Sequence, residues 1–222
     1  MMKKLYGVGT GPGDVEHLTL KAVRVINEAD VIFAPNNKGK KMALDTVKPF
    51  ILDKKVVFVD FPMGQVKGKD YSSAAKTIEE EILENGCGVF LTIGDPMVYS
   101  TFIYLMEEIE KIGVEVEIVP GITSFTAGAA VCKTALTEKG DRFLLCDEMV
   151  DEDILKCCDS ICVLKTSKNK EDILNILEKN KFSYSYIKRC TLPEELVLVD
   201  REEILADKDY MSFIIGRRLK ND

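Results

Sequence analysis

Apolar runs and amphipathic stretches alternate along the first half of the chain. The short apolar runs predict strands at 5–9, 29–34, 56–59, 89–93 and 114–119. Between them, apolar residues recurring every three or four positions predict helices at 18–28, 72–84 and 98–112. Thr19 is expected near the first helix start, Pro35 after the second strand, and Gly86-Cys87-Gly88 at the end of the second helix. This alternation is typical of a mostly parallel sheet covered by helices.

The second half shows the same alternation and then changes character. Its pattern predicts helices at 124–132, 151–157, 170–179 and 202–206, and strands at 143–146, 161–164, 183–188, 196–199 and 211–215. The last strands follow one another as in a hairpin, so we expect a mixed sheet. With a hinge at 118–120, the chain is predicted to form two α/β subdomains, 1–117 with the mostly parallel sheet and 118–222 with the mixed sheet.

Composition narrows the class of protein. The 222 residues are 46% hydrophobic and 30% charged, as in ordinary globular proteins. No apolar stretch reaches the roughly 18 residues of a membrane span, so no membrane partner is expected. The net charge of −7 argues against a general nucleic-acid surface, which needs a basic field. The first residues run directly into a glycine motif without a signal-peptide pattern, and we expect a cytoplasmic protein.

Cysteine and histidine usage points the same way. The seven cysteines are odd in number and lack repeated C-x-x-C spacing, so free thiols in a reducing compartment are expected. His17 is the one histidine and has no partner at zinc-ligand spacing. We therefore expect no protein-bound metal.

Glycine- and proline-rich loops follow the predicted strands, where open α/β sheets bind ligands. They are Gly7 to Asp14, Gly94-Asp95-Pro96, Pro120 to Ser124 and Cys190 to Glu194. The first loop lacks the third glycine of the dinucleotide fingerprint and the Gly-Lys-Ser/Thr of a phosphate loop. It is either a tightly packed turn or a surface that a large flat ligand approaches, with Asp14 as a cap or a substrate contact.

The other loops also allow two interpretations each. Gly94-Asp95-Pro96 is an ordinary turn, or a carboxylate and exposed carbonyls that suit a sulfonium or an amino group. Thr123 or Ser124 caps the helix that follows, or the small residues of that helix let a planar ring lie against the backbone. The lysine-rich run 38–41 is a solvated face, or with Arg189 it meets the carboxylates of a ligand.

Taken in order, these four loops resemble the tetrapyrrole (corrin/porphyrin) methylase family over nearly the whole chain. Residues 18–24 with 29–35, and 94–101 with 189–193, are similar to the branch that methylates the C-20 meso carbon of precorrin-2 or cobalt-factor II in cobalamin biosynthesis. The continuation Tyr99-Ser100-Thr101 is the more specific feature, and we expect it to start a helix at the mouth of the site.

The resemblance implies a homodimer that binds S-adenosylmethionine (SAM) as methyl donor in a cleft between the subdomains. It implies cofactor contacts on the residues Gly94, Asp95, Val98, Thr123, Ser124, Thr166, Cys190 and Thr191. Thr166, Cys190 and Thr191 are placed by strand order and not by a matched motif. The reduced tetrapyrrole would contact Gly9, Gly11, Asp14, Tyr99, Ser100 and Arg189.

The catalytic residues stay unassigned, with Tyr99 and Asp14 as candidates for accepting or relaying the proton that leaves the methylated carbon. Two alternatives remain open. The enzyme could methylate another ring position or a diphthamide precursor, or the chain could be a non-enzymatic binder of tetrapyrroles or nucleotides. The sequence does not distinguish a cobalt-containing substrate from a cobalt-free one.

Overall fold

The computed structural model describes residues 3–36, 41–61, 68–147 and 150–219. The chain divides into two compact units, Met1–Thr123 and Ser124–Asp222. The first unit thus extends six residues beyond the expected boundary at 117/118. The physical reason is β5 (Glu115–Val119), which pairs with β1 and therefore lies wholly in the first unit.

A five-stranded sheet in the order β3-β2-β4-β1-β5 forms the centre of the first unit. Its strands pair in parallel throughout, which confirms the expected sheet. Besides β5, the strands are β1 (Lys4–Gly9), β2 (Val31–Pro35), β3 (Lys55–Val59) and β4 (Cys87–Thr92). Cys87 and Gly88 were expected to end a helix and instead begin β4, because Lys4 and Leu5 of β1 pair with them.

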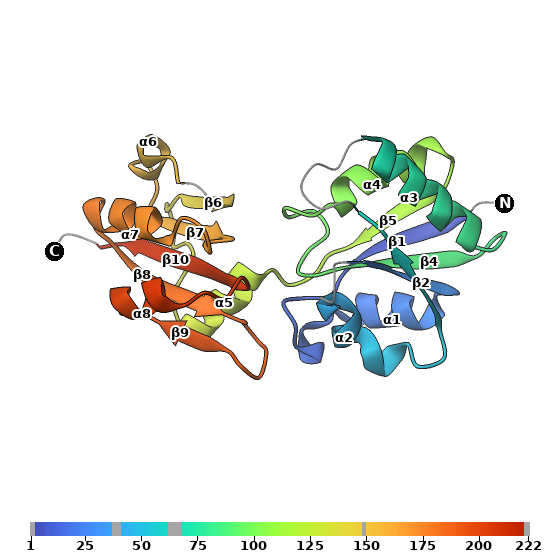
Figure 1. Ribbon diagram of the computed structural model, residues 1–222, viewed down its shortest axis with the longest axis horizontal. Coiled ribbons are helices and arrows are strands. Elements are labelled where there is room, and N and C mark those ends of the chain that lie inside the picture. The colour runs from blue at the N-terminus through green and yellow to red at the C-terminus, as the bar shows by residue number, and fades with distance from the viewer. Residues whose placement is uncertain (1–2, 37–40, 62–67, 148–149, 220–222) are drawn as a thin grey trace. The chain divides into compact units, whose positions relative to one another are not determined.

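Helices cover both faces of this sheet (Figure 1). One face carries α1 (Leu20–Glu28) and α2 (Met42–Val47), and the other carries α3 (Gly68–Glu81) and α4 (Phe102–Lys111). Two 3₁₀ helices, Val15–His17 and Lys48–Phe50, and helix α2 were not predicted. The Thr19 hydroxyl accepts a hydrogen bond from the amide of Ala22, which confirms Thr19 at the start of α1.

The apolar run of β4 explains why the sheet is buried on both sides. Val89 and Leu91 pack into the core on the α1 side, whereas Phe90 packs into the core on the α3 and α4 side. Each of these side chains is at most 1% exposed. Burial of one such side chain stabilises the fold by about 1.5–3 kcal/mol. Three consecutive apolar residues on alternating faces of β4 therefore favour helices on both sides of the sheet.

Helix α4 is shorter than expected, because the predicted stretch 98–112 becomes helical only at Phe102. The residues before it form turns and bends, and Tyr99 adopts a left-handed backbone with φ of 46°. Phe102 packs over β1 so closely that a side-chain carbon on Gly7 would lie 2.2 Å from its ring. This contact ties the start of α4 to the centre of the sheet.

The second unit holds a mixed sheet in the order β6-β7-β10-β8-β9, as expected. Its strands are β6 (Phe143–Asp147), β7 (Ser160–Leu164), β8 (Phe182–Lys188), β9 (Leu196–Leu198) and β10 (Ser212–Arg218). Strands β6 and β7 pair in parallel, while β10 pairs antiparallel with β7 and β8, and β9 pairs antiparallel with β8. The carboxyl ends of β6, β7 and β8 therefore share one edge with the start of β10.

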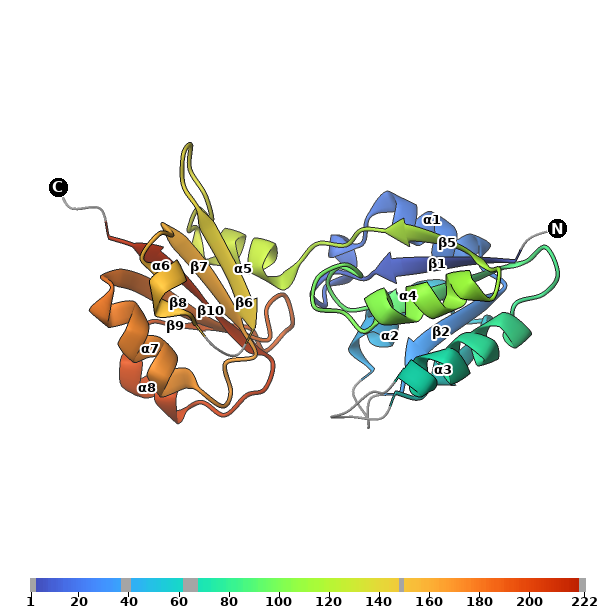
Figure 2. The same cartoon turned by 90° about the horizontal axis from the view of Figure 1, so that it is seen from above.

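Helices α7 (Lys170–Lys179) and α8 (Arg201–Ala206) lie on one face of this sheet, and α5 (Ser124–Cys132) lies on the other (Figure 2). The short helix α6 (Glu152–Leu155) adds Leu155 to the core beneath α7. In α5, a side-chain carbon on Gly128 would lie 2.6 Å from the ring of Phe213. The small residues of α5 therefore serve close packing on β10.

Candidate functional site

Three strand ends of the first unit come into backbone contact at the carboxyl edge of its sheet. An added side-chain carbon at Gly9, the last residue of β1, would lie 2.5 Å from the carbonyl oxygen of Gly94 and 2.6 Å from the amide of Gly121. One at Gly121 would lie 2.1 Å from the same oxygen. Real side-chain carbons do not approach backbone atoms so closely. Glycine at these positions is what allows the loops after β1, β4 and β5 to touch.

The contact lies where the direction of the chain's crossovers reverses. Strands β1 and β4 are neighbours, yet β1 is followed by α1 on one face and β4 by α4 on the other. Open α/β sheets bind ligands at such a switch point. Here the two loops are joined by hydrogen bonds of 3.3 Å and 2.8 Å between the backbones of Gly11 and Gly94. The edge is thereby rigid and has little side-chain bulk.

Asp95 fastens the loop after β4 to the loop after β5. Its Oδ2 accepts a hydrogen bond of 3.0 Å from the amide of Gly121, and its Oδ1 accepts one of 2.8 Å from the amide of Met97. The structure therefore supports the turn interpretation of Asp95, with the carboxylate as a clamp. A carboxylate has about four lone-pair sites, so two backbone donors leave capacity for a further cation or donor.

Two features of this edge leave room for a ligand. Gly94 has a φ of +68°, and nothing lies within 4 Å of the position where its side-chain carbon would stand. Beside it, the Thr92 hydroxyl at the end of β4 is buried and has no hydrogen-bond partner among the described residues. Buried polar atoms are almost always paired, so this hydroxyl is a candidate ligand contact.

The remaining predicted residues of the first unit lie along the same loops. The Asp14 carboxylate caps the 3₁₀ helix by accepting from the amide of Glu16 at 2.9 Å. Val98 is half-buried and Tyr99 is 48% exposed. Ser100 accepts a hydrogen bond of 3.1 Å from the amide of Phe102. The expectation that Tyr99 to Thr101 begin a helix is wrong, because they precede α4, whose N-cap residue is Thr101 without a side-chain cap bond.

In the second unit, five of the predicted residues lie around the shared edge of β6, β7, β8 and β10, namely Ser124, Thr166, Arg189, Cys190 and Thr191. The buried Cys190 thiol donates to the carbonyl oxygen of Ser124 across 3.9 Å, which brings the start of α5 to the loop after β8. Burial raises the pKa of Cys190 to about 12, so the group stays a neutral thiol. The amide of Thr191 donates to the Glu195 carboxylate at 2.6 Å.

Thr166 follows β7 and is completely buried, with its hydroxyl 3.3 Å from that of Ser212. This contact joins the loop after β7 to the start of β10, and the assignment of Thr166 to the cofactor stays a prediction. Arg189 is paired as well, because its Nε donates to Asp209 at 2.7 Å and Nη1 lies 3.8 Å from Glu194. Of the basic run 38–41, residues 38–40 lie outside the described residues.

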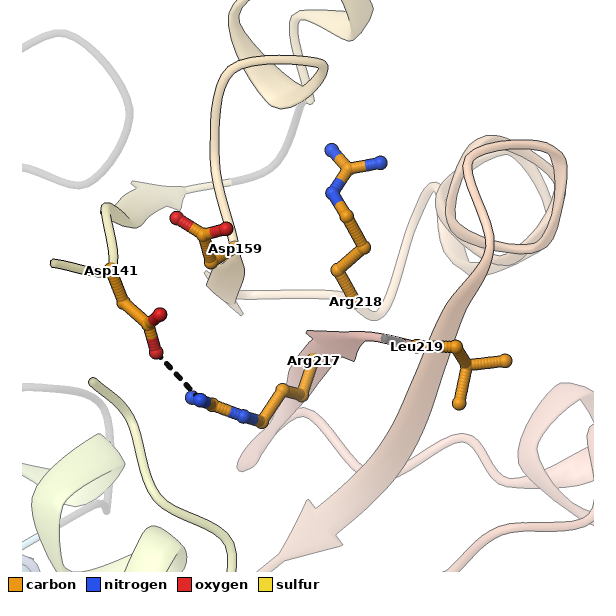
Figure 3. A pocket seen from close by; sticks show the side chains of 5 residues that line it. All are labelled: Asp141, Asp159, Arg217, Arg218 and Leu219. Carbon is orange, nitrogen blue, oxygen red and sulfur yellow. Dashed lines mark hydrogen bonds and ion pairs between the residues drawn. The ribbon is translucent and has the colours of Figure 1, made fainter. Parts of the chain in front are cut away.

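A hollow in the second unit does not coincide with any of these residues. It encloses about 60 Å³ and is lined by Asp141, Asp159, Arg217, Arg218 and Leu219 (Figure 3). Arg217 donates to Asp141 at 2.6 Å, and Arg218 donates to three backbone carbonyls. Its volume is far below the roughly 300 Å³ of small pockets for drug-sized ligands.

The described ranges contain no group of three or more histidine, cysteine, aspartate or glutamate side chains placed to hold a metal ion. Within the same ranges, no helix combines the length and apolarity that a membrane span needs.

Comparison with known proteins shows to which family this chain is similar. The model of the family "Tetrapyrrole (Corrin/Porphyrin) Methylases" matches residues 4–206. The probable cobalt-precorrin-2 C(20)-methyltransferase of Methanocaldococcus jannaschii is 35% identical over 226 aligned residues, covering 99% of this chain and 98% of that protein.

Two solved structures show the same fold. Cobalt precorrin-4 methyltransferase, CbiF, has a TM-score of 0.77 at 20% identity, covering 96% of this chain and 94% of that one. The uroporphyrin-III C-methyltransferase of Thermus thermophilus, solved with S-adenosyl homocysteine, has a TM-score of 0.74 at 22% identity, covering 96% and 97%.

The fold and these matches define an enzyme that transfers a methyl group to carbon. The chain belongs to the tetrapyrrole (corrin/porphyrin) methylases, which confirms the resemblance seen in its loops.

Sequence reasoning missed several residues that shape the two edges. Thr92 ends β4, Ser212 begins β10, and Asp207 and Asp209 lie in the turn before β10, all without any recognisable motif. Glu195 directly follows the loop Cys190 to Glu194, four residues from Thr191, the spacing at which its carboxylate accepts a hydrogen bond from that amide. That spacing is the one signal available before the structure.

Proposed function

We propose that this protein transfers a methyl group from SAM to the C-20 meso carbon of precorrin-2 or cobalt-factor II in cobalamin biosynthesis. One observation carries the proposal: a relative described as a C(20)-methyltransferase matches this chain essentially end to end at 35% identity. The similarity of 94–101 and 189–193 to the C-20 branch supports the same ring position.

The residues at the first carboxyl edge fit a cofactor of this kind. The loop at Gly94 has its side-chain direction open, and the buried Thr92 hydroxyl beside it needs a partner. A sulfonium and an amino group are both cations, which the remaining acceptor sites of Asp95 and nearby carbonyl oxygens attract. We therefore assign Gly94, Asp95 and Val98, with Thr123 after β5, to the cofactor. Gly9, Gly11, Asp14, Tyr99 and Ser100 are assigned to the tetrapyrrole, together with Arg189 of the second unit.

In the second unit we assign Ser124, Thr166, Cys190 and Thr191 to the cofactor. Cys190 illustrates a requirement of the chemistry, because thiolates are strong nucleophiles and would compete for a methyl group. Its burial keeps it protonated at physiological pH. The thiol therefore contributes shape and a weak donor and does not react.

When bound, the donor supplies an electrophilic methyl group on a good leaving group. The protein's own contribution is then placement and exclusion of water, which together can lower a barrier by about 7–11 kcal/mol at best. The glycine contact between three loops and the Asp95 clamp provide rigid placement. Tyr99, half exposed beside the loop, and Asp14 are the candidates for taking the proton released from the ring carbon.

The same proposal includes the assembly and setting of the enzyme. We infer a homodimer acting in the cytoplasm, with no metal held by the protein and any cobalt arriving in the substrate. All seven cysteines are free, which fits a reducing compartment. Light scattering of the purified protein tests the dimer.

The function is tested by incubating the protein with methyl-labelled SAM and enzymatically prepared precorrin-2 or cobalt-factor II. We expect one labelled methyl group per tetrapyrrole and no transfer to uroporphyrinogen III. Running both substrates in parallel also decides which form is preferred. Binding of both ligands without turnover would favour a non-enzymatic binder, and transfer to uroporphyrinogen III would contradict the assigned substrate.

A further inference from the structure

A network of partly buried charges joins the loop that follows β8 to the turn between α8 and β10. Asp207 is its centre. Its Oδ1 accepts from the Tyr186 hydroxyl at 2.8 Å and from the amide of Asp209 at 2.8 Å, and its Oδ2 lies 2.5 Å from the Lys188 ammonium. The side chains of Lys188 and Asp207 are 23% and 11% exposed. Three donors from two elements thus fix one carboxylate.

Lys170 fixes the same turn from the first residue of α7. It is 7% exposed, and its ammonium donates to the backbone carbonyls of Ile204, at 2.8 Å, and of Asp207. Burial lowers its pKa, and the ring of Tyr186 lies 5.1 Å away. A buried lysine satisfied by backbone carbonyls holds the chain path at the end of α8.

Because the turn is held in this way, the Asp209 carboxylate lies beside the Arg189 guanidinium. The Asp209 Oδ1 accepts from the amide of Met211 at 2.9 Å, while its Oδ2 accepts from Arg189 Nε at 2.7 Å. In return, the Arg189 amide donates to the carbonyl of Met211 at 2.8 Å. The turn and the loop after β8 are therefore fastened by both a side-chain bond and a backbone bond.

The loop needs such fastening, because its backbone is unusual. Arg189 and Thr191 have φ values of 47° and 69°, in the left-handed region that residues with a side-chain carbon avoid. Neither is glycine or asparagine. Non-glycine residues keep this conformation only where the surroundings over-determine it, and such sites cluster at ligand contacts. Here the two residues flank Cys190, which the proposed function assigns to the cofactor.

We propose that Asp209 is a positioning residue for methyl transfer: through Arg189 it holds the left-handed loop that presents Cys190 and Thr191 to the cofactor. The inference rests on the proposed function for the identity of the ligand, but the positioning itself is a property of the free protein. It assigns a role to a residue that touches no reacting group.

Two substitutions separate the bonds of Asp209. Asp209→Asn keeps an oxygen for the amide of Met211 and removes the acceptor for Arg189, whereas Asp209→Ala removes both. Glu152→Gln is the matched control, since Glu152 pairs with Lys179 at 2.9 Å at the opposite end of α7 from Lys170. Amide hydrogen exchange over 189–195 in the free protein and SAM affinity by calorimetry are the two readouts.

In Asp209→Asn we expect faster exchange at Leu192, whose amide bonds the Arg189 carbonyl at 2.9 Å, and about three- to tenfold weaker SAM binding. Glu152→Gln should change neither. Unchanged exchange in both Asp209 variants overturns the positioning role, whatever the ligand. Faster exchange with unchanged SAM affinity overturns the link to the cofactor. Failure of the wild-type protein to bind SAM would instead contradict the proposed function, while the exchange data still decide the positioning.

Discussion

At the scale of single residues, the site depends on positions where a side chain is missing. Gly9, Gly94 and Gly121 let three loops meet, yet they differ in what a substitution would encounter. At Gly9 and Gly121 an added carbon strikes backbone atoms, so replacement must displace the loops. At Gly94 it enters open space, and only the left-handed backbone resists it. Gly94 is therefore the position at which ligand access can be tested without breaking the fold.

Gly94→Ala should weaken SAM binding at least tenfold while costing about 1–2 kcal/mol of stability, the strain of a left-handed alanine. The matched control is Gly113→Ala, because Gly113 also has positive φ, +85°, and open space around it but lies at the turn after α4. Calorimetry and thermal melting of both variants check this. Equal SAM affinity in the two variants would remove Gly94 from the cofactor site.

At the scale of elements, two neighbouring residues before α4 are expected to differ in role, one in stability and the other in substrate specificity. The Ser100 hydroxyl accepts a hydrogen bond from the amide of Phe102, the first residue of α4, so Ser100→Ala should cost about 0.5–1.5 kcal/mol of stability. Tyr99 lies half exposed in a left-handed bend, and Tyr99→Phe should leave the melting temperature unchanged. If Tyr99 orients the tetrapyrrole, its variant will lower methyl transfer or scatter it over ring positions. Full, position-specific activity in Tyr99→Phe would show that the ring position is set elsewhere.

The turn between α8 and β10 should make the second unit sensitive to acid. Burial of Asp207 opposes its charge, but Lys188, the amide of Asp209 and the Tyr186 hydroxyl hold its pKa at about 2. A carboxyl pKa lowered on folding stabilises the protein above the unfolded value, near 4, and this contribution is lost as pH falls toward 2. Melting temperature measured from pH 6 to pH 2.5 should therefore fall less steeply in Asp207→Asn. Parallel curves for the two proteins would contradict this role of Asp207.

Comparison of the predicted with the observed helices and strands shows what the sequence could predict. β4 was identified because Val89, Phe90 and Leu91 form a continuous apolar run that is buried on both faces of the sheet. Helices α5 and α7 match their predicted bounds. The start of α4 was placed four residues early, because apolar spacing continues through Val98 while the backbone is held in a bend by Tyr99 and the contact of Phe102 with Gly7.

The loops of the site could be predicted from the sequence, but the contacts that their residues make could not. Glycine and proline mark where the chain turns, so the loop after β4 was found directly. The bonds from the amides of Met97 and Gly121 to Asp95 could not be foreseen, nor could the bond from Arg189 to Asp209. The ligand contacts expected of Asp95 and Arg189 stay predictions. Partners distant in sequence carry no signal in one chain, which is why these bonds required the structure.

At the scale of the whole molecule, each of the two units presents strand ends with unusual backbone at one edge of its sheet. The first unit uses glycine there, and the second uses left-handed Lys165, Arg189 and Thr191. Membership of the tetrapyrrole methylases gives the chain its activity, methyl transfer, and the part that each edge takes in it stays a proposal. By their names, the relatives act on different substrates, namely cobalt-precorrin-2, cobalt precorrin-4 and uroporphyrin-III, so the fold leaves the substrate and the ring position undetermined.

The most direct test of the account is therefore the position of the new methyl group. Precorrin-2 or cobalt-factor II should be incubated with the protein and SAM carrying a ¹³C-labelled methyl group, and the product should be examined by carbon NMR. The account predicts a single labelled methyl group on the C-20 meso carbon. A label at any other ring carbon, with C-20 unlabelled, would contradict it.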